Sequence, residues 1–180
     1  MKKLLPLLAV STITLAGCNH TPLVGSTFNT PTVYGYHRAI DYDTGGYNKP
    51  VIAAADGEVY LLELPVPKWV QQKNPGYTTH TVVGIKHGEF AAVYAHVAPN
   101  NLKVGDPIKR GEVIGYSDHS GWDSKGNRGP YYAHVHFRLS KFPRIRKPID
   151  PAPYMIGCFE PSKTYTETQL TFPVPCGSSK

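Results

Sequence analysis

Short apolar stretches separated by turn residues dominate the chain after residue 50. These stretches are rich in Val, Ile, Tyr and Phe, several alternate with polar residues, and most end at Gly, Pro, Asn or Asp. That pattern is typical of strands joined by turns, and helical periodicity is scarce. We therefore predict a mainly β protein, built on an antiparallel β-sheet or sandwich with few helices. The predicted strands are residues 51–54, 57–64, 81–86, 90–94, 107–108, 113–116 and 133–140.

Two segments between these strands are too long for tight turns. Residues 65–80 read PVPKWVQQKNPGYTTH and residues 118–130 read DHSGWDSKGNRGP. Loops of this size inside a domain are usually functional or mobile.

The first 17 residues have the layout of an export signal. A basic head at Lys2 and Lys3 precedes an apolar stretch from 4 to 15, and small residues precede Cys18. A transmembrane anchor would need roughly 20 apolar residues, which this stretch does not supply. We predict a signal peptide at 1–17.

The tetrad LAGC that ends at Cys18 resembles the lipobox of bacterial lipoproteins, in which the cysteine is lipidated. A plain secretory cleavage is the alternative. By resemblance to enteric bacteria, Asn19 favours sorting to the outer membrane. We expect a lipid anchor at Cys18, a linker at 18–33, and a location on the outer membrane facing the periplasm.

Two further cysteines, Cys158 and Cys176, lie in a C-terminal tail at 155–180 that is rich in Pro and Thr. Disulfides persist in exported proteins, so we expect these two to pair and to staple the tail. Two buried free thiols are the alternative. A metal site at these two cysteines agrees less well with the sequence, because the histidines that could complete it lie elsewhere in the sequence.

Composition and charge narrow the partners. The chain has 180 residues, of which 41% are hydrophobic, which suffices for one domain with a core. Its formal net charge of +6 becomes +4 once Lys2 and Lys3 are removed. A mildly basic surface suits an anionic cell wall or membrane, and the sequence has no motif for nucleic acid.

Candidate chemistry begins with the run YYAHVHF. On a strand, His134 and His136 share one face, although a pair of structural histidines would read the same way. His37 and Asp41 stand four residues apart, about 13 Å on an extended chain, so they can share an ion only if the chain bends between them. Two imidazoles, one carboxylate and a water together make the open tetrahedral site of a catalytic zinc.

His96, in the run VYAHV, follows a predicted strand. A lone histidine there is more often structural. A zinc hydrolase nevertheless needs a group to accept a proton and to stabilise an oxyanion, and the chain has no HExxH glutamate. Histidines outside the coordination shell could fill that role.

The phrases HRAID and HVH, together with KPVIAAADGEV, YAHV, KVGDPIKRGEVIG and PIDPAPY, resemble the lysostaphin and LytM-type zinc peptidases of family M23 over residues 34–154. This resemblance implies a groove that holds one zinc per chain. By resemblance, the zinc ligands are His37, Asp41 and His136, and the catalytic pair is His96 and His134.

The sequence departs from the family pattern at Ala39, where many relatives have glycine, and at the inserted residues 131–133 before the HVH run. No ligand is lost, but these departures bear on substrate preference, because the insertions at residues 68–80 and 122–132 would form the walls of the groove.

The resemblance implies an endopeptidase that hydrolyses peptidoglycan stem-peptide cross-links, at D-alanyl to diaminopimelyl bonds given the expected location, with wall-remodelling proteins as partners. The alternatives are a non-catalytic LytM-type regulator of wall amidases and a zinc- or wall-binding module. A D-Ala-D-Ala carboxypeptidase fits less well, because no ExxH element is present.

Overall fold

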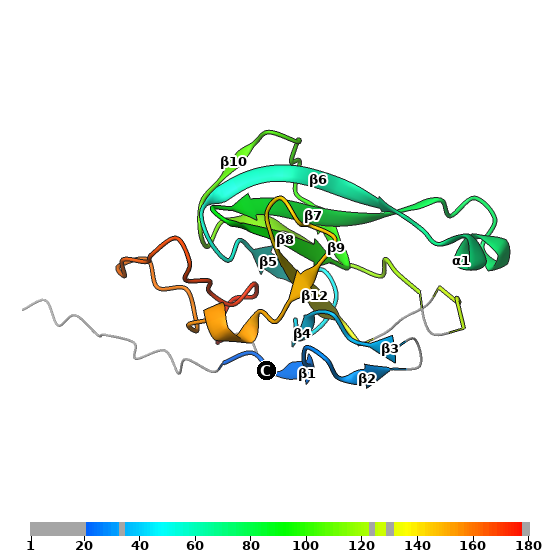
Figure 1. Ribbon diagram of the computed structural model, residues 1–180, viewed down its shortest axis with the longest axis horizontal. Coiled ribbons are helices and arrows are strands. Elements are labelled where there is room, and N and C mark those ends of the chain that lie inside the picture. The colour runs from blue at the N-terminus through cyan, green and yellow to red at the C-terminus, as the bar shows by residue number, and fades with distance from the viewer. Residues whose placement is uncertain (1–20, 33–34, 123–124, 129–131, 178–180) are drawn as a thin grey trace, which may run out of the picture.

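The computed structural model describes residues 21–32, 35–122, 125–128 and 132–177, and the strands in these ranges far outnumber the helices (Figure 1). The prediction of a mainly β protein with antiparallel sheets and few helices is confirmed. Cys18 and the export segment lie outside the described residues. No helix in these ranges is long and apolar enough to cross a membrane. The elements in chain order are β1 Val24–Ser26, β2 Pro31–Thr32, β3 Gly35–Tyr36, β4 Ile40–Asp43, β5 Pro50–Ile52, β6 Gly57–Pro65, α1 Lys68–Lys73, β7 Thr79–His87, β8 Phe90–Ala95, β9 Val97–Pro99, β10 Pro107–Ile108, β11 Val113–Ser117, β12 His134–Lys141, β13 Pro148–Ile149 and the 3-10 turn η1 Ala152–Tyr154.

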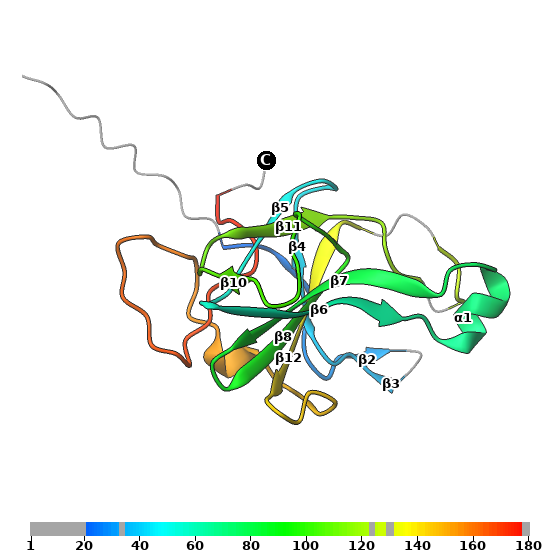
Figure 2. The ribbon, with the colours of Figure 1, turned by 90° about the horizontal axis from the view of Figure 1, so that it is seen from above.

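The strands form one large sheet and two small ones. The large sheet runs in the order β1-β4-β12-β8-β7-β6-β10, with β13 paired to β12, and all its pairs are antiparallel. Strands β5, β11 and β9 form a second sheet, and β2 pairs with β3 in a hairpin. Figures 1 and 2 show β6, β7 and β8 running side by side along the molecule.

Alternation along β12 gives the large sheet two different faces. Val135, Phe137 and Leu139 are fully buried. They pack in one cluster with residues of the second sheet, such as Val51 and Ile114. His134 and His136 alternate with these residues and therefore project from the opposite face. We call the first the core face and the second the site face.

The C-terminal tail contributes to the core. Cys158 and Cys176 form a disulfide across 18 residues of sequence, with their Cα atoms 5.8 Å apart. Inside that loop Leu170 and Val174 are buried within the main cluster. The Thr171 N–H donates to the carbonyl of Ala54 at 2.9 Å. The tail is thus packed against the β-domain and forms part of its core.

The first long segment, expected to be a loop, contains helix α1. Val70 is buried under the helix, and the Gln71 amide donates to the carbonyl of Val66 at 2.6 Å. Asn74 caps the C-terminal end of α1, where its side-chain amide donates to the carbonyl of Val70 at 2.9 Å. The same amide donates to the carbonyl of Gly126 at 2.7 Å. The Asn74–Gly126 bond joins the two long segments into one structure.

Candidate metal centre

Pairing between β4 and β12 sets Asp41 beside the HVH run. Asp41 lies directly opposite His136 in the antiparallel register, and residues opposite one another share a face of the sheet. The Asp41 Oδ1 and His136 Nδ1 atoms are 3.0 Å apart. A sheet register therefore brings together two residues that are 95 positions apart in sequence.

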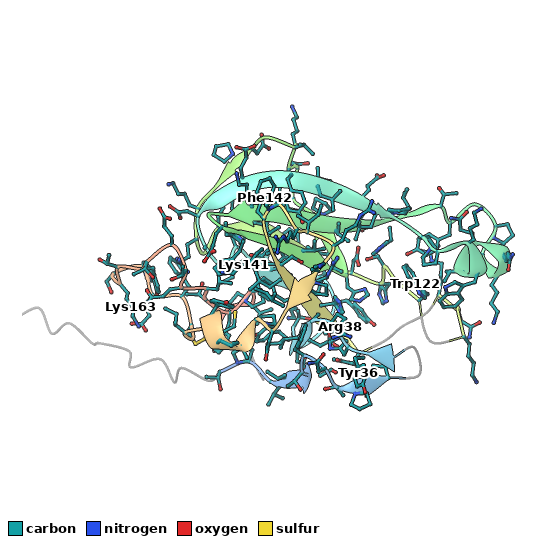
Figure 3. All side chains as sticks on the ribbon, in the orientation of Figure 1. Tyr36, Arg38, Trp122, Lys141, Phe142 and Lys163 are labelled. Atoms are coloured by element: carbon teal, nitrogen blue, oxygen red, sulfur yellow. A yellow bond between two sulfur atoms is a disulfide. The ribbon has the colours of Figure 1, made fainter. Side chains whose placement is uncertain are left out.

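His37 reaches the same point because the chain bends between β3 and β4. The bend lies at Ala39, whose side chain is fully buried, so the residue that departs from the family glycine fits. His37 Nδ1 donates to the carbonyl of Thr27 at 3.1 Å, which leaves the lone pair on Nε2. Beside it, Arg38 contacts Tyr36 and donates to Asn29 Oδ1 at 2.7 Å (Figure 3).

The three side chains predicted as ligands converge on one small space. His37 Nε2 is 3.1 Å from Asp41 Oδ1 and 3.1 Å from His136 Nδ1. A tetrahedral zinc with bonds of about 2.0–2.1 Å holds its ligand atoms about 3.3 Å apart, so these spacings fit the ion. The only group in the described chain with such a donor set is this one. Three electron-rich atoms this close need a proton or a cation among them, and two imidazoles with one carboxylate are donors that zinc accepts.

The charges at this site are strongly coupled. Burial by itself would raise the pKa of Asp41, but hydrogen bonds with His136 and His37 outweigh it and hold that pKa well below its usual range. In return, the hydrogen bond with Asp41 raises the pKa of His37. Burial lowers the pKa of His136. The carboxylate is therefore ionised at neutral pH, as a metal ligand must be.

His134 stands beside the three ligands. Its Nδ1 donates to the carbonyl of Tyr132 at 2.8 Å, so the lone pair is on Nε2, which lies 3.8 Å from Asp41 Oδ1. The Tyr132 ring stacks on the imidazole with centroids 4.4 Å apart, and its hydroxyl donates to Asp41 Oδ2 at 3.3 Å. Tyr132 belongs to the insertion before the HVH run, and sequence analysis did not assign it a contact with Asp41.

His96 completes the group. Its ring centroid lies 4.7 Å from that of His134 and 6.1 Å from that of His136. Its Nδ1 donates to the carbonyl of Ser120, which again leaves the lone pair on Nε2. Burial, followed by the neighbouring His134 and His136, lowers the pKa of His96 to about 3. All five residues predicted for the site are thus brought together, while their roles as ligands and catalysts remain predictions.

Residues 118–122, the first part of the second long segment, form a wall beside this group. His80, at the start of β7, packs edge-on against Trp122 at 5.1 Å, and Figure 3 shows Trp122 on the side of the molecule that carries α1. A small pocket lies between Tyr47, His96, Asp118, Ser120, Tyr132 and His134. A larger cavity of about 590 Å³ lies elsewhere, against the tail, and none of the predicted site residues lines it. The contact between His80 and Trp122 was not predicted from the sequence.

Comparison with known proteins decides the family. The sequence model that describes peptidase family M23 matches residues 35–151 of this chain. The chain belongs to this family. M23 peptidases are zinc-dependent and act on peptidoglycan peptides, and the resemblance seen in the sequence is confirmed at that level. The lipoprotein assignment stays a prediction.

Three individual proteins illustrate the relationship. The chain is 29% identical over 107 residues to the cell division protein DipM of Caulobacter vibrioides, a match that covers 57% of this chain but only 15% of DipM. It is similar to the structure of LytU, with 25% identity, a TM-score of 0.53, and coverage of 74% of this chain and 83% of the other. The catalytic domain of the prophage-encoded M23 protein EnpA from Enterococcus faecalis gives 26% identity, a TM-score of 0.53, and coverage of 74% and 91%.

Proposed function

We propose that this M23 protein is a zinc-dependent endopeptidase that hydrolyses the peptide cross-links of bacterial peptidoglycan. The observation that carries the proposal is the set of His37, Asp41 and His136 atoms at 3.0–3.1 Å, with two further imidazoles beside it. A structural zinc site would be closed by a fourth protein ligand, whereas a site for hydrolysis keeps a position open. No fourth ligand joins the group among the described residues.

Zinc held by these residues would supply a Lewis acid and a water that loses its proton near neutral pH. His134 and His96 each keep an unprotonated Nε2, because their Nδ1 protons are taken by backbone carbonyls. Either nitrogen can accept a proton from the attacking water, and the resulting N–H can donate to the developing oxyanion.

These residues account for every proton transfer that the hydrolysis requires. The water oxygen bonds to the carbonyl carbon of the substrate, the C–N bond breaks, and the proton taken up by an imidazole passes to the leaving amine. We propose the stem-peptide cross-link as substrate, at the bond from D-alanine to diaminopimelate, because the family acts on peptidoglycan peptides.

The test is digestion of purified sacculi and of cross-linked muropeptides, followed by mass spectrometry, with zinc quantified on the same protein sample. We expect cross-linked dimers to be converted to monomers. The Asp41→Ala variant serves as the control without a complete ligand set. Intact cross-links after incubation with fully zinc-loaded protein would contradict the endopeptidase proposal.

Similarity to a cell division protein favours a second candidate, a regulator that activates a wall amidase at the division site. In that case the zinc-loaded protein would leave every peptide bond intact and would raise the activity of an amidase added to the same sacculi. The filled set of ligand positions supports the enzyme as the first candidate.

We also propose that the mature chain is lipid-anchored through Cys18 and faces the periplasm from the outer membrane. The LAGC tetrad supports this, and Cys18 lies outside the described residues. A Cys18→Ser variant should leave the membrane fraction and enter the aqueous phase in a detergent partition. Unchanged partitioning would contradict the anchor. A tethered enzyme would meet the wall, and its wall-remodelling partners, from one side.

A further inference from the structure

Asp118 lies at the centre of a small network that surrounds His96. Its backbone N–H donates to the carbonyl of His96 at 2.9 Å. One carboxylate oxygen accepts the N–H of Ser120 at 2.7 Å, and the other accepts the hydroxyl of Thr81 at 3.1 Å. Asp118 therefore connects three parts of the chain: Thr81 on β7, Ser120 in the loop after β11, and His96.

The carbonyl of Ser120 is the group that accepts the Nδ1 proton of His96. Peptide planarity ties that carbonyl to the N–H of Gly121, which donates to the hydroxyl of Tyr77 at 3.0 Å. The loop is thus held at two successive residues. The Asp118 carboxylate accepts the N–H of Ser120, and the Tyr77 hydroxyl accepts the N–H of Gly121. The direction of one carbonyl in turn decides which ring nitrogen of His96 carries the proton.

The backbone at His96 needs such support. His96 has φ of 62°, in the left-handed region that non-glycine residues rarely occupy. Space beside its ring is also limited, because a Cβ added at Gly121 would lie 2.6 Å from His96 Cε1. An unusual backbone conformation persists only where the surroundings hold it in place, and Asp118 supplies one of those constraints.

We propose that Asp118 is a positioning residue for hydrolysis, which fixes the orientation and the tautomer of His96 by holding the Ser120 peptide in place. This inference rests on the proposed role of His96 in hydrolysis. The hydrogen bonds that carry this role do not require a negative charge. A carboxamide can still accept the Ser120 N–H through its oxygen, and it can donate to the Thr81 hydroxyl in place of accepting from it.

The experiment compares Asp118→Ala, Asp118→Asn and the parent, each as the full mature chain loaded with zinc. Nitrogen NMR of the histidine rings reports which nitrogen of His96 is protonated, and steady-state kinetics on a cross-linked muropeptide separates kcat from KM. For Asp118→Ala we expect a mixture of His96 tautomers and a fall in kcat of about tenfold to 100-fold, with KM and zinc content unchanged. Asp118→Asn should retain the parental tautomer and most of the parental kcat.

Asp106→Ala is the matched control. Its carboxylate also accepts a backbone N–H in a turn, that of Lys103 at 2.7 Å, but no contact joins it to the site. It should lower thermal stability by an amount similar to Asp118→Ala and leave the His96 signals and kcat unchanged. Equal effects of the two substitutions on kcat would reduce Asp118 to a structural role and overturn the inference.

The NMR arm decides the inference even if the parent cleaves no substrate, an outcome that would refute the endopeptidase proposal by itself. A tautomer change in Asp118→Ala that is absent from Asp118→Asn supports the positioning role. Identical His96 signals in the parent and Asp118→Ala overturn it. If Asp118→Ala fails to fold, Thr81→Val removes one of the same bonds, and a His96 tautomer unaltered in that variant counts against the inference.

Discussion

The two faces of the large sheet use histidine in opposite ways. On the core face, His87 donates from Nδ1 to the carbonyl of Asp56 at 3.0 Å, and its Nε2 accepts the Tyr94 hydroxyl at 2.8 Å. Both ring nitrogens are satisfied inside the protein, as buried polar groups usually are. On and beside the site face, His37, His96 and His134 each use Nδ1 for one backbone carbonyl. The Nε2 atoms of His37 and His134 lie 3.1 and 3.8 Å from Asp41 Oδ1.

The difference lies in how many partners the protein provides. A ring with two internal partners is a structural element, whereas a ring with one is fixed in orientation and keeps a nitrogen for an ion or a substrate. In the described chain, the two buried side-chain polar atoms without a hydrogen-bond partner are His80 Nδ1 and Ser120 Oγ, and both belong to the wall of the site. Among the described residues, neither of these two atoms lies on the core face.

The largest effect should come from the site face. Asp41→Ala removes one of three ligands, so zinc should fall well below one equivalent and peptide cleavage should become undetectable. The loss in zinc affinity should exceed the roughly 10- to 100-fold typical of an outer supporting residue. Metal analysis and muropeptide digestion on the same sample check this, and full zinc in the variant would refute the ligand assignment.

Next come the two imidazoles assigned to catalysis. His134→Ala and His96→Ala should each keep near-stoichiometric zinc and lower turnover by roughly 100-fold or more. Because both serve one hydrolytic step, the double variant should lose much less than the product of the single losses. Parental turnover in His134→Ala would show that this ring takes no part in catalysis.

The core face should respond to pH instead. Burial lowers the pKa of His87 in the folded protein to about 4, below its ordinary 6.5. The unfolded chain therefore binds the proton more tightly. The contribution to stability is complete above pH 6.5, is lost as the pH falls from 6.5 to about 4, and levels off below that, for a total on the order of 3 kcal/mol.

Urea unfolding of the parent and of His87→Leu between pH 4 and 7 tests this slope. The difference between the two proteins isolates His87 from His96, whose pKa is also low and which both proteins share. Parallel pH profiles would show that His87 does not contribute to the slope.

The smallest expected effect is that of His87→Leu at neutral pH. The variant leaves the Tyr94 hydroxyl without its acceptor and should lower the free energy of unfolding by about 1–3 kcal/mol. Zinc content should equal that of the parent. Each site substitution should lower turnover by the same factor in the His87→Leu background as in the parent. Loss of zinc in His87→Leu would mean that the two faces are not independent.

Long alternating or apolar runs could be predicted from the sequence, and so could the short strands β5 and β10, whereas several other short strands could not. Strand β12, predicted at 133–140, is observed at His134–Lys141, and β7 and β8 are equally close to their predicted ranges. Strand β4 was missed, because the acidic residues in IDYD suggested chemistry rather than a strand. Strands of two or three residues, such as β2 and β13, carry too few side chains for any periodicity.

For the site, the sequence supplied the chemical groups and the structure supplied their arrangement. The bend required between His37 and Asp41 is present at Ala39. The carbonyls that set the tautomers of His96 and His134 could not be foreseen, because backbone direction in a loop leaves no side-chain signature. Asp118 and His80 were likewise missed, since each matters only through tertiary neighbours.

The packing of residues 170–174 into the core also bears on the order in which the protein can be made. Leu170 and Val174 complete the apolar cluster that covers β5 and β12, yet they are made after every strand of the described chain. A nascent chain that lacks them would leave part of that cluster exposed until residues 170–174 had been made. The β-domain can therefore complete its core only after all of its strands have been made.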